Sequence, residues 1–439
     1  MRFRRLILIA TVAALPAVTS QGCIVPNVKP IKGAEDVAPI KIGETTREQV
    51  VTILGEPNVS TDDRLLVYNW EKSRYFWVVA AGYSAVGGDA GLEGFRMAVE
   101  LDATGRVGDV LTADSTEQPK PLPEDWVGVK GCGMIKLPNA IAVSHDADRI
   151  AALVRSELCL VMADKPESAR RIDLGKVPFF GGLYGSFIAF SPDDSAIAIA
   201  ASGQLPKLID ITSGEVIGAF GTRLGQKQMK YLVARPVAFS PDGSSLAAPD
   251  VDGSLVVWET ATGAELLRHP AANTGSIAFS PDGSLIAVGF GGGAFKVLNV
   301  SDGRILQERS SVPGTPLMTA VAFSPNGRWL AVGTPVHAEL WETPGLHRRA
   351  VFLLPFFKHA PAYNIYRQPV AGFSPDGRNL AVIVHEMLTM IDTERMAVGD
   401  VYRFRFPVMS AAFDPDWRRM AVLSANGIRL WEAPATAQE

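Results

Sequence analysis

The chain has 439 residues, which is enough for two or three domains and for a large buried core. Hydrophobic residues make up 47% and charged residues 20%, a globular composition that excludes an intrinsically disordered chain. The net charge of −4 argues against a general nucleic-acid binder, and three cysteines and six histidines argue against a disulfide scaffold or a multi-metal protein.

The first residues have the features of a secretory signal. Met1 to Arg5 carries three arginines, and the apolar run from Leu6 to Leu15 follows. This run is too short to cross the hydrocarbon core of a bilayer, which is about 30 Å thick. We therefore expect residues 1–22 to be a signal peptide rather than a membrane span.

The end of this segment, Gly22-Cys23, resembles the processing site of bacterial lipoproteins. The resemblance implies that Cys23 becomes the lipidated first residue of the mature chain. Ile24 follows, which by the same resemblance implies the periplasmic side of the outer membrane. Plain export with cleavage after Ser20 is the alternative, and it would leave a soluble periplasmic protein.

Residues 39–113 are predicted to form a small α+β domain. A helix is expected to open within Gly43 to Val50, with Thr45 and Glu48 at capping-box spacing and Val50, Ile53 and Leu54 as its apolar stripe. Gly55 and Pro57 should end this helix. The expected strands then lie at 66–71, within 75–80, at 95–101 and at 106–111, with a turn at 102–105 between the last two.

These residues carry a family resemblance. The pattern Gly43-x-Thr45-x-x-x-Gln49-Val50-x-x-x-Leu54-Gly55-x-Pro57, with the later Tyr68-x-Trp70, resembles the SmpA/OmlA family, which includes the BamE lipoprotein. The resemblance implies a partner-binding helix-plus-sheet module without catalytic residues. The apolar stretch from Phe76 to Gly88 is either a buried strand and loop or a membrane- or partner-facing patch.

The rest of the chain is a repeat array. Residues 114–124 are polar and proline-rich and are predicted to be a linker, and residues 125–439 to be the array. One motif, a Phe followed by a Ser-Pro-Asp-Gly-like turn, recurs at intervals of roughly 40–50 residues, the period of propeller blades. Its copies begin at Val143, Phe190, Phe239, Phe279, Phe323, Phe373 and Phe413.

Each copy reads as strand, tight turn, strand, turn and a third strand that ends at a residue such as Trp258, Trp341 or Trp431. The array resembles the WD-repeat β-propeller family, and its seven copies predict seven blades. The Gly-His dipeptide of that family is missing, so its histidine hydrogen-bond tetrad is not expected in most blades. The predicted fold class is thus mainly β, with a small α+β N-terminal domain and a seven-bladed β-propeller.

The last copy stops one strand short. Ring closure would remove the exposed sheet edges, so we expect a strand within Trp126 to Leu137 to pair with Gly427 to Trp431. Cys132 lies in this closing segment and Cys159 in the first copy. In an exported protein the two would form a disulfide if they are close, and otherwise they are two buried thiols.

Aromatic and cationic residues gather in the connections between blades. These connections emerge on one face of a propeller, and such a composition is typical of a recognition surface. The alternative is that the aromatic side chains only pack over the blade ends. The residues predicted to bind a partner are Tyr184, Lys230, Tyr231, Phe357, Lys358, Tyr366, Arg367 and Arg403.

The sequence carries no nucleophile elbow and no histidine spacing typical of a metal site, so we predict no catalytic residue, no metal ligand and no cofactor. The predicted function is a lipid-anchored, non-enzymatic scaffold for other envelope proteins, accessory to outer-membrane assembly or maintenance. It would contact the membrane through its lipid and would not bind nucleic acid. The alternative is a periplasmic enzyme or ligand receptor that uses the central channel of the propeller.

Overall fold

The computed structural model describes most of the chain beyond residue 38. The described ranges are 39–57, 59–61, 64–73, 78–81, 84–87, 92–114, 119–122, 127–129, 140–154, 157–174, 187–200, 205–221, 236–250, 252–271, 274–310, 319–355, 369–406, 408–414, 416–417, 419–424 and 427–432. The predicted signal peptide and Cys23 lie outside them. No helix among the described residues has the length and apolar character needed to cross a membrane.

The single described helix, α1 (Arg47–Leu54), begins one residue later than the capping prediction. Thr46 is its N-cap: the Thr46 hydroxyl accepts from the Gln49 amide at 3.4 Å, and the Thr46 amide donates to Gln49 Oε1 at 2.8 Å. The prediction of a Thr45–Glu48 box was wrong because Thr45 is held by the sheet. Its hydroxyl accepts from the Lys41 amide, and its carbonyl accepts from the Val107 amide.

Helix α1 covers one face of a four-stranded sheet. Val50 and Leu54 pack there against Tyr68, Met97 and other strand residues, as the apolar stripe predicted. The order in the sheet is β1-β2-β5-β6, and β3 pairs with β4 in a separate two-stranded sheet. The bounds are β1 (Val59–Thr61), β2 (Leu65–Ser73), β3 (Val78–Ala81), β4 (Ser84–Gly87), β5 (Leu92–Leu101) and β6 (Val107–Asp114). We call residues 39–114 the N-terminal unit.

The rest of the described chain forms four-stranded antiparallel sheets that follow one another along the sequence. In each, strands that are consecutive in the chain are neighbours in the sheet. The first four sheets are β9 (Ala140–Val143), β10 (Arg149–Val154), β11 (Glu157–Met162), β12 (Ala169–Asp173); β13 (Phe187–Phe190), β14 (Ala196–Ala200), β15 (Lys207–Asp210), β16 (Val216–Ala219); β17 (Ala238–Phe239), β18 (Ser245–Pro249), β19 (Leu255–Glu259), β20 (Glu265–His269); and β21 (Thr274–Phe279), β22 (Leu285–Phe290), β23 (Phe295–Asn299), β24 (Ile305–Arg309).

The remaining sheets follow the same plan with two additions. They are β25 (Ala320–Phe323), β26 (Trp329–Gly333), β27 (His337–Glu342), β28 (His347–Leu353); β29 (Val370–Phe373), β30 (Asn379–Val384), β31 (Met387–Asp392), β32 (Ala397–Arg403), β7 (Lys120–Pro121); and β33 (Val408–Phe413), β34 (Arg419–Ser424), β35 (Gly427–Glu432), β8 (Val127–Gly128). The strand positions agree with the repeat motif.

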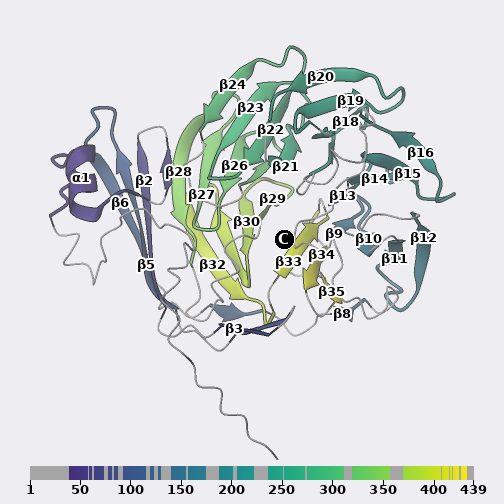
Figure 1. Ribbon diagram of the computed structural model, residues 1–439, viewed down its shortest axis with the longest axis horizontal. Helices are drawn as coiled ribbons and strands as arrows, with labels where there is room; N and C mark the ends of the chain where they lie inside the picture. Colours follow the sequence, from purple (N-terminus) through teal and green to yellow (C-terminus); the bar gives the residue numbers. More distant parts are fainter. Residues whose placement is uncertain are drawn as a thin grey trace, which may run out of the picture.

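Figure 1 shows these sheets arranged around a common centre, with the first strand of each sheet innermost. Strand β8 closes the ring, because it pairs antiparallel with β35 through Gly128 and Arg429 and through Val127 and Leu430. The prediction of a closing strand before the first repeat is therefore confirmed. Strand β8 thus covers the outer edge of β35, the third strand of the last repeat.

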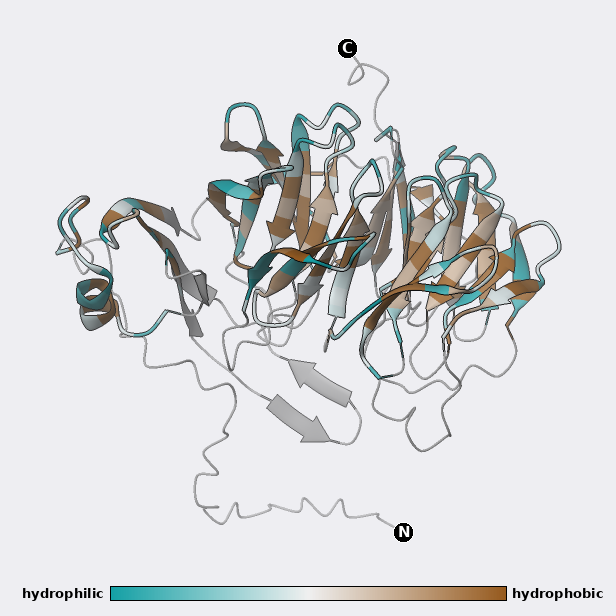
Figure 2. Cartoon of the chain, turned by 90° about the horizontal axis from the view of Figure 1, so that it is seen from above, coloured by the Kyte–Doolittle hydropathy of each residue, from teal (hydrophilic) through white to brown (hydrophobic). Residues whose placement is uncertain are grey.

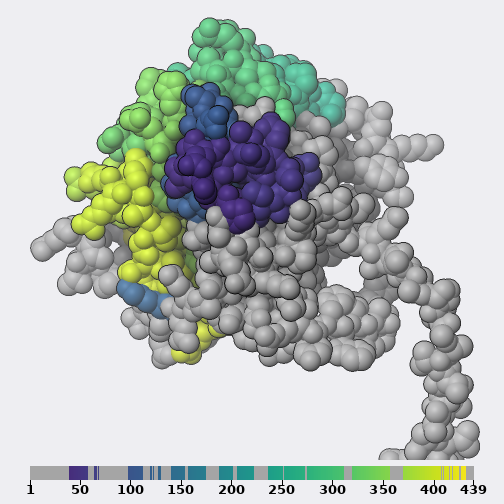
Figure 3. All heavy atoms as spheres, turned by 90° about the vertical axis from the view of Figure 1, so that its left-hand side faces the viewer, coloured from purple at the N-terminus to yellow at the C-terminus, as the bar shows by residue number. Residues whose placement is uncertain are grey.

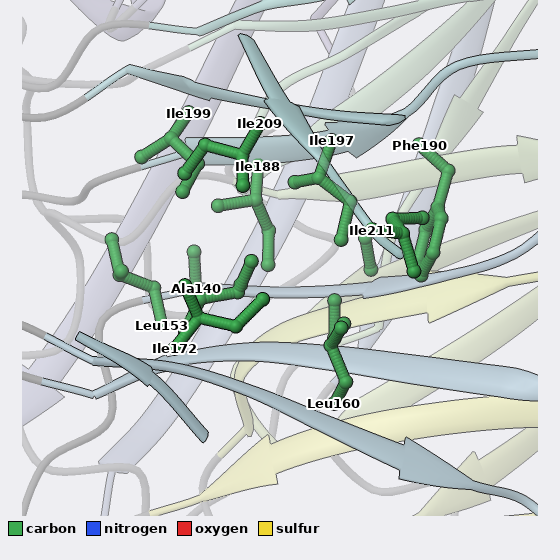
Figure 4. Close-up of a cluster of buried hydrophobic side chains, with 13 residues drawn as sticks. Ala140, Leu153, Leu160, Ile172, Ile188, Phe190, Ile197, Ile199, Ile209 and Ile211 are labelled. Carbon is green, nitrogen blue, oxygen red and sulfur yellow. The ribbon is translucent and has the colours of Figure 1, made fainter. Parts of the chain in front are cut away.

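The core lies between the faces of neighbouring sheets. Between the sheets β9–β12 and β13–β16, Leu153 and Ile172 face Ile188, Phe190 and Ile197 (Figure 4). Figure 2 shows the same pattern for the whole molecule, with apolar residues along the strands and hydrophilic residues at the turns. Burying apolar area in this way contributes roughly 25 cal/mol per Å² and is the main force that holds the sheets together.

The outermost strands protect their edges. From β16 to β32, the pairing between the third and fourth strand of each sheet shifts register, as at Leu208/Ile209 and Val257/Trp258. Such bulges twist an edge strand and discourage pairing with other chains. Two outer strands, β28 and β32, run for seven residues, and the chain itself covers both of them.

Strand β32 is covered by part of the predicted linker. Lys120 and Pro121 form β7 and pair in parallel with Tyr402 and Arg403, and Leu122 packs into the same core. This stretch is thus part of the sheet ring, which the polar composition of the linker did not indicate.

Strand β28 is covered by the N-terminal unit. Leu65 and Ala98, on the sheet face opposite α1, pack against Val336, Val351 and Leu353. The Arg348 guanidinium donates to Glu100 Oε1 at 3.0 Å across the same contact. Figure 3 shows the purple N-terminal residues lying against the green strands of the ring. The linker composition favours few contacts between the two parts, and the structure shows this apolar cluster and one ion pair between them.

Candidate functional site

The strand directions define two ends of the ring. In each four-stranded sheet, the turn between the first and second strand lies at one end, and the connection from the fourth strand to the next sheet lies at the other. The connections 174–187, 219–238, 309–320 and 353–370 therefore all leave from the same end. We call it the connection end, and we call the opposite end, with the Ser-Pro-Asp-Gly turns, the tight-turn end.

Most of the predicted partner-binding residues fall within these connections. Arg403 is within the described residues and lies at the C-terminal end of β32, also at the connection end. Outside the described residues are Tyr184, Lys230, Tyr231, Phe357, Lys358, Tyr366 and Arg367.

Arg403 is held in place by the sheet around it. Its guanidinium donates to Glu386 Oε1 at 3.3 Å, its backbone pairs with Pro121, and 37% of its side chain is exposed. The neighbouring Phe404 is buried at 1% exposure and contacts Phe406 in the core. Phe404 therefore packs between two sheets and does not belong to an exposed surface.

At the tight-turn end, each turn is closed by its own side chains. In the turn after β17, the Ser240 hydroxyl donates to Asp242 Oδ1 at 2.6 Å and accepts from the Ser245 amide at 2.9 Å. Asp242 also accepts from the Ser244 amide. The bonds from Ser240 and Ser244 hold the pKa of Asp242 below its ordinary value. The carboxylates of these turns are thus used to fix the backbone.

Neighbouring turns also contact one another. The carboxylate of Asp194, which stands where most copies have glycine, accepts from the amides of His145 and Asp146 at 2.9 and 2.8 Å. Arg419 in the last repeat donates to the carbonyl of Ala147 in the first. A chain of turn-to-turn contacts therefore links the last repeat to the first repeat and the first to the second at this end.

A buried polar cluster joins the sheets β21–β24 and β25–β28. Arg309, at the end of β24, donates through Nη1 to both carboxylate oxygens of Glu339 at 2.6 and 2.7 Å and through Nε to the Gly293 carbonyl. Glu339 also accepts from Trp341 Nε1 at 2.9 Å and lies 3.1 Å from His337 Nε2. Arg309, His337 and Glu339 are each at most 3% exposed.

Burial opposes the ionisation of Glu339, but Arg309 and His337 outweigh it and hold the pKa of the carboxyl well below its ordinary range. Burial lowers the pKa of His337, which therefore stays neutral. The cluster is a neutral, inter-sheet contact. Sequence reasoning missed it because β24 (ILQER) and β27 (HAELWE) each mix polar and apolar residues, so Arg309 and Glu339 do not stand out in the sequence.

Cys159 is disulfide-bonded in the structure and is 2% exposed. The other two cysteines of the sequence, Cys23 and Cys132, lie outside the described residues. Within the described ranges, no three His, Cys, Asp or Glu side chains are close enough together to hold a metal ion.

Comparison with known proteins agrees with this architecture. The family model "WD domain, G-beta repeat" (WD40) matches residues 309–334. The chain is similar to the solved structure of hydrazine synthase from Kuenenia stuttgartiensis, with a TM-score of 0.53 and 15% identity, over 69% of this chain and 97% of that one. No curated protein matches. The repeat match, the structural similarity and the sheet topology together support a WD-repeat β-propeller.

Proposed function

We propose that this protein is a lipid-anchored, non-enzymatic scaffold of the bacterial cell envelope that binds other envelope proteins at the connection end of its propeller. The observation that supports the proposal is the direction of the described strands: the stretches richest in aromatic and cationic residues join strand ends that all lie at the connection end. Aromatic and arginine side chains are the usual anchors of protein interfaces.

We further propose that the propeller has seven blades, one for each copy of the repeat motif, and that the N-terminal unit is SmpA/OmlA-like. The capped helix, the Gly43 to Pro57 pattern and the helix-on-sheet arrangement support the second point. Such a unit would make the protein an accessory of outer-membrane assembly or maintenance, on the periplasmic side.

The disulfide at Cys159 supports export, because disulfides persist in oxidising compartments such as the periplasm. We propose Cys132 as its partner. Peptide mapping of the purified chain without reductant should recover a linked pair containing both cysteines. Recovery of Cys132 as a free thiol would contradict this assignment.

Crosslinking in intact cells tests the binding end. The Tyr231→Ala and Tyr366→Ala variants should lose crosslinked envelope partners while the melting temperature stays within about 2 °C of the parent, because exposed side chains contribute little to stability. Arg395→Ala is the matched control: its side chain is 83% exposed, and it lies in a turn at the tight-turn end. A loss of melting temperature with unchanged crosslinking would make these tyrosines packing residues instead.

Membrane fractionation tests the anchor. Cys23→Ser should release the protein from the membrane into the soluble periplasmic fraction, since acyl chains hold a protein by roughly 0.8 kcal/mol per buried methylene. Release of the parent chain itself by mild washing would contradict lipidation.

A further inference from the structure

One face of the sheet β25–β28 carries both the buried polar cluster and the contact with the N-terminal unit. In an antiparallel pair, directly opposed residues lie on the same face of the sheet. Val351 on β28 is opposite Glu339 on β27, and Leu353 is opposite His337. Both of these β28 residues pack against the N-terminal unit. The N-terminal unit therefore covers the sheet face directly beside the cluster.

Arg348 is a second link between the cluster and the N-terminal unit. Its guanidinium donates to Glu100 Oε1 of the N-terminal unit at 3.0 Å, and 11% of its side chain is exposed. On the other side, Arg348 is paired with Trp341, whose Nε1 donates to Glu339. Burial opposes the ionisation of Glu339, and the charge of Arg348 is one of those that hold the pKa of this carboxyl low. Arg348 thus interacts with a carboxylate of the N-terminal unit and with one of the cluster.

The strength of the cluster depends on the exclusion of water. Arg309 and Glu339 are at most 3% exposed, and the attraction between two charges grows as water is removed from around them. Arg309 Nη2 is buried and has no hydrogen-bond partner among the described residues. Water that reached the cluster would solvate Nη2 and both charges, and it would weaken the attraction between them. A cover on this face therefore strengthens the contact between the sheets β21–β24 and β25–β28.

We propose that the N-terminal unit is a lid that locks the boundary between the sheets β21–β24 and β25–β28 by keeping water from the Arg309–Glu339 pair. When the lid leaves β28, water reaches the pair and the boundary loosens at the end of β24, where the connection 309–320 begins. The lid acts within the chain, so it does not depend on the proposed binding of envelope partners.

The lid is held by a short tether. Strand β6 ends at Asp114, and β7, which is paired with β32, begins at Lys120. A chain of this length spans at most about 20 Å, so the released lid stays close to its site. Because a tether gives a high effective concentration, a small contact is enough to keep the lid closed and still allows it to open.

Hydrogen–deuterium exchange of the full purified chain tests the lid. Ala98→Glu places a charge in the contact with β28, on the sheet face opposite α1, and should release the lid. The amides of β24 and β27 should then exchange about tenfold faster or more, because the boundary opens locally. The amides of β15, in a distant sheet, should keep their rates. Glu100→Gln removes only the acceptor of Arg348 and should give a smaller acceleration in the same two strands.

Thr52→Glu is the matched control, because it adds the same charge to the N-terminal unit on an exposed position of α1. It should leave the exchange of β24 and β27 unchanged. An absence of acceleration in Ala98→Glu and Glu100→Gln would overturn the proposal. Equal acceleration in β15 would also overturn it, because the substitutions would then destabilise the whole chain.

A second background tests the role of the ion pair. In a chain with Arg309→Met and Glu339→Leu, the boundary holds no ion pair that water could weaken. Adding Ala98→Glu to this chain should change the exchange of β24 by less than about twofold. The same acceleration in both backgrounds would show that the lid does not act through the Arg309–Glu339 pair, and the proposal would be wrong.

Discussion

Gly327 occupies the left-handed position of the turn after β25, with a φ of 70°, and no neighbouring atom lies within 4 Å of the place where a Cβ would stand. Gly327→Ala should therefore destabilise the protein through backbone strain alone, by about 1–2 kcal/mol. Gly291→Ala is the control, since that site is equally open and has no left-handed φ; it should change stability by less than about 0.5 kcal/mol. Denaturant unfolding measures both, and equal losses would show that strain is not the cause.

The buried Arg309–Glu339 pair should have a measurable effect on the free energy of unfolding. Glu339→Gln leaves the buried Arg309 without its charge partner, which should cost about 3–5 kcal/mol of unfolding free energy. The double variant Arg309→Met/Glu339→Leu removes both charges and should recover most of that loss. If the double variant is as unstable as Glu339→Gln alone, the cost comes from lost packing rather than from an unpaired charge.

His337 should make stability depend on pH. Burial lowers its pKa in the folded state, and the groups around it are Glu339, Thr334, Arg309 and Arg348. Below the ordinary histidine value of about 6.5, the unfolded chain binds a proton that the folded chain does not. Stability should therefore be full above pH 6.5 and fall as the pH drops, by at most about 1.4 kcal/mol per pH unit.

Unfolding curves between pH 7.5 and 5 measure this slope. His337→Gln should reduce the dependence of stability on pH. His269→Gln should reduce it less, because His269 is only partly buried, even though burial lowers its pKa too. An unchanged slope in His337→Gln would mean that the buried imidazole does not titrate differently in the two states.

At the scale of elements, the closing strand β8 offers a matched pair of sites. Val129, which directly follows β8, is 6% exposed and packs with Ile428 and Leu430, whereas Val127 is 46% exposed. Val129→Asp buries a charge at the ring closure and should cost more than about 2 kcal/mol, while Val127→Asp should be nearly neutral. Comparable effects at both sites would contradict the pairing of β8 with β35.

The repeat motif predicted the strands well because each copy combines a turn signal with short apolar runs, and both are local. Strand β7 was missed because two residues, Lys120 and Pro121, carry no periodicity. The N-cap was misplaced by one residue because Thr45 and Thr46 both satisfy the spacing, and the hydrogen bonds of Thr45 to the rest of the N-terminal unit decide between them.

At the scale of the whole molecule, the contact between the N-terminal unit and β28 could not be predicted from local pattern. When the outer strands are aligned, Val351 stands where β20 has Arg268 and β24 has Glu308, but β16 has Ala219 and β32 has Val401 at the same position. An apolar residue at this position therefore does not by itself indicate a covered edge. The partner-binding residues of the connections remain predictions, since they lie outside the described residues.

The contact between the N-terminal unit and β28 predicts that the same two substitutions help a shortened chain and harm the full chain. A chain that starts at Pro119 exposes Val351 and Leu353 and should aggregate, and Val351→Lys with Leu353→Lys should restore its solubility. In the full chain the same two substitutions should lower the melting temperature, because they bury charge against Leu65 and Ala98. Light scattering and thermal unfolding measure the two effects. A soluble chain from Pro119 without substitutions would show that the contact is dispensable.

The closing sheet joins residues that are about 300 positions apart in the chain, since Gly128 pairs with Arg429. Bringing such distant segments together costs about 5 kcal/mol of chain entropy, which the sheets between them offset as they stack in sequence. Until the last strands leave the ribosome or the export channel, β8 lacks its partner and the first sheet lacks a neighbour on one side. The ring therefore completes only after synthesis of the whole chain, and its final step is the meeting of the two ends of the array.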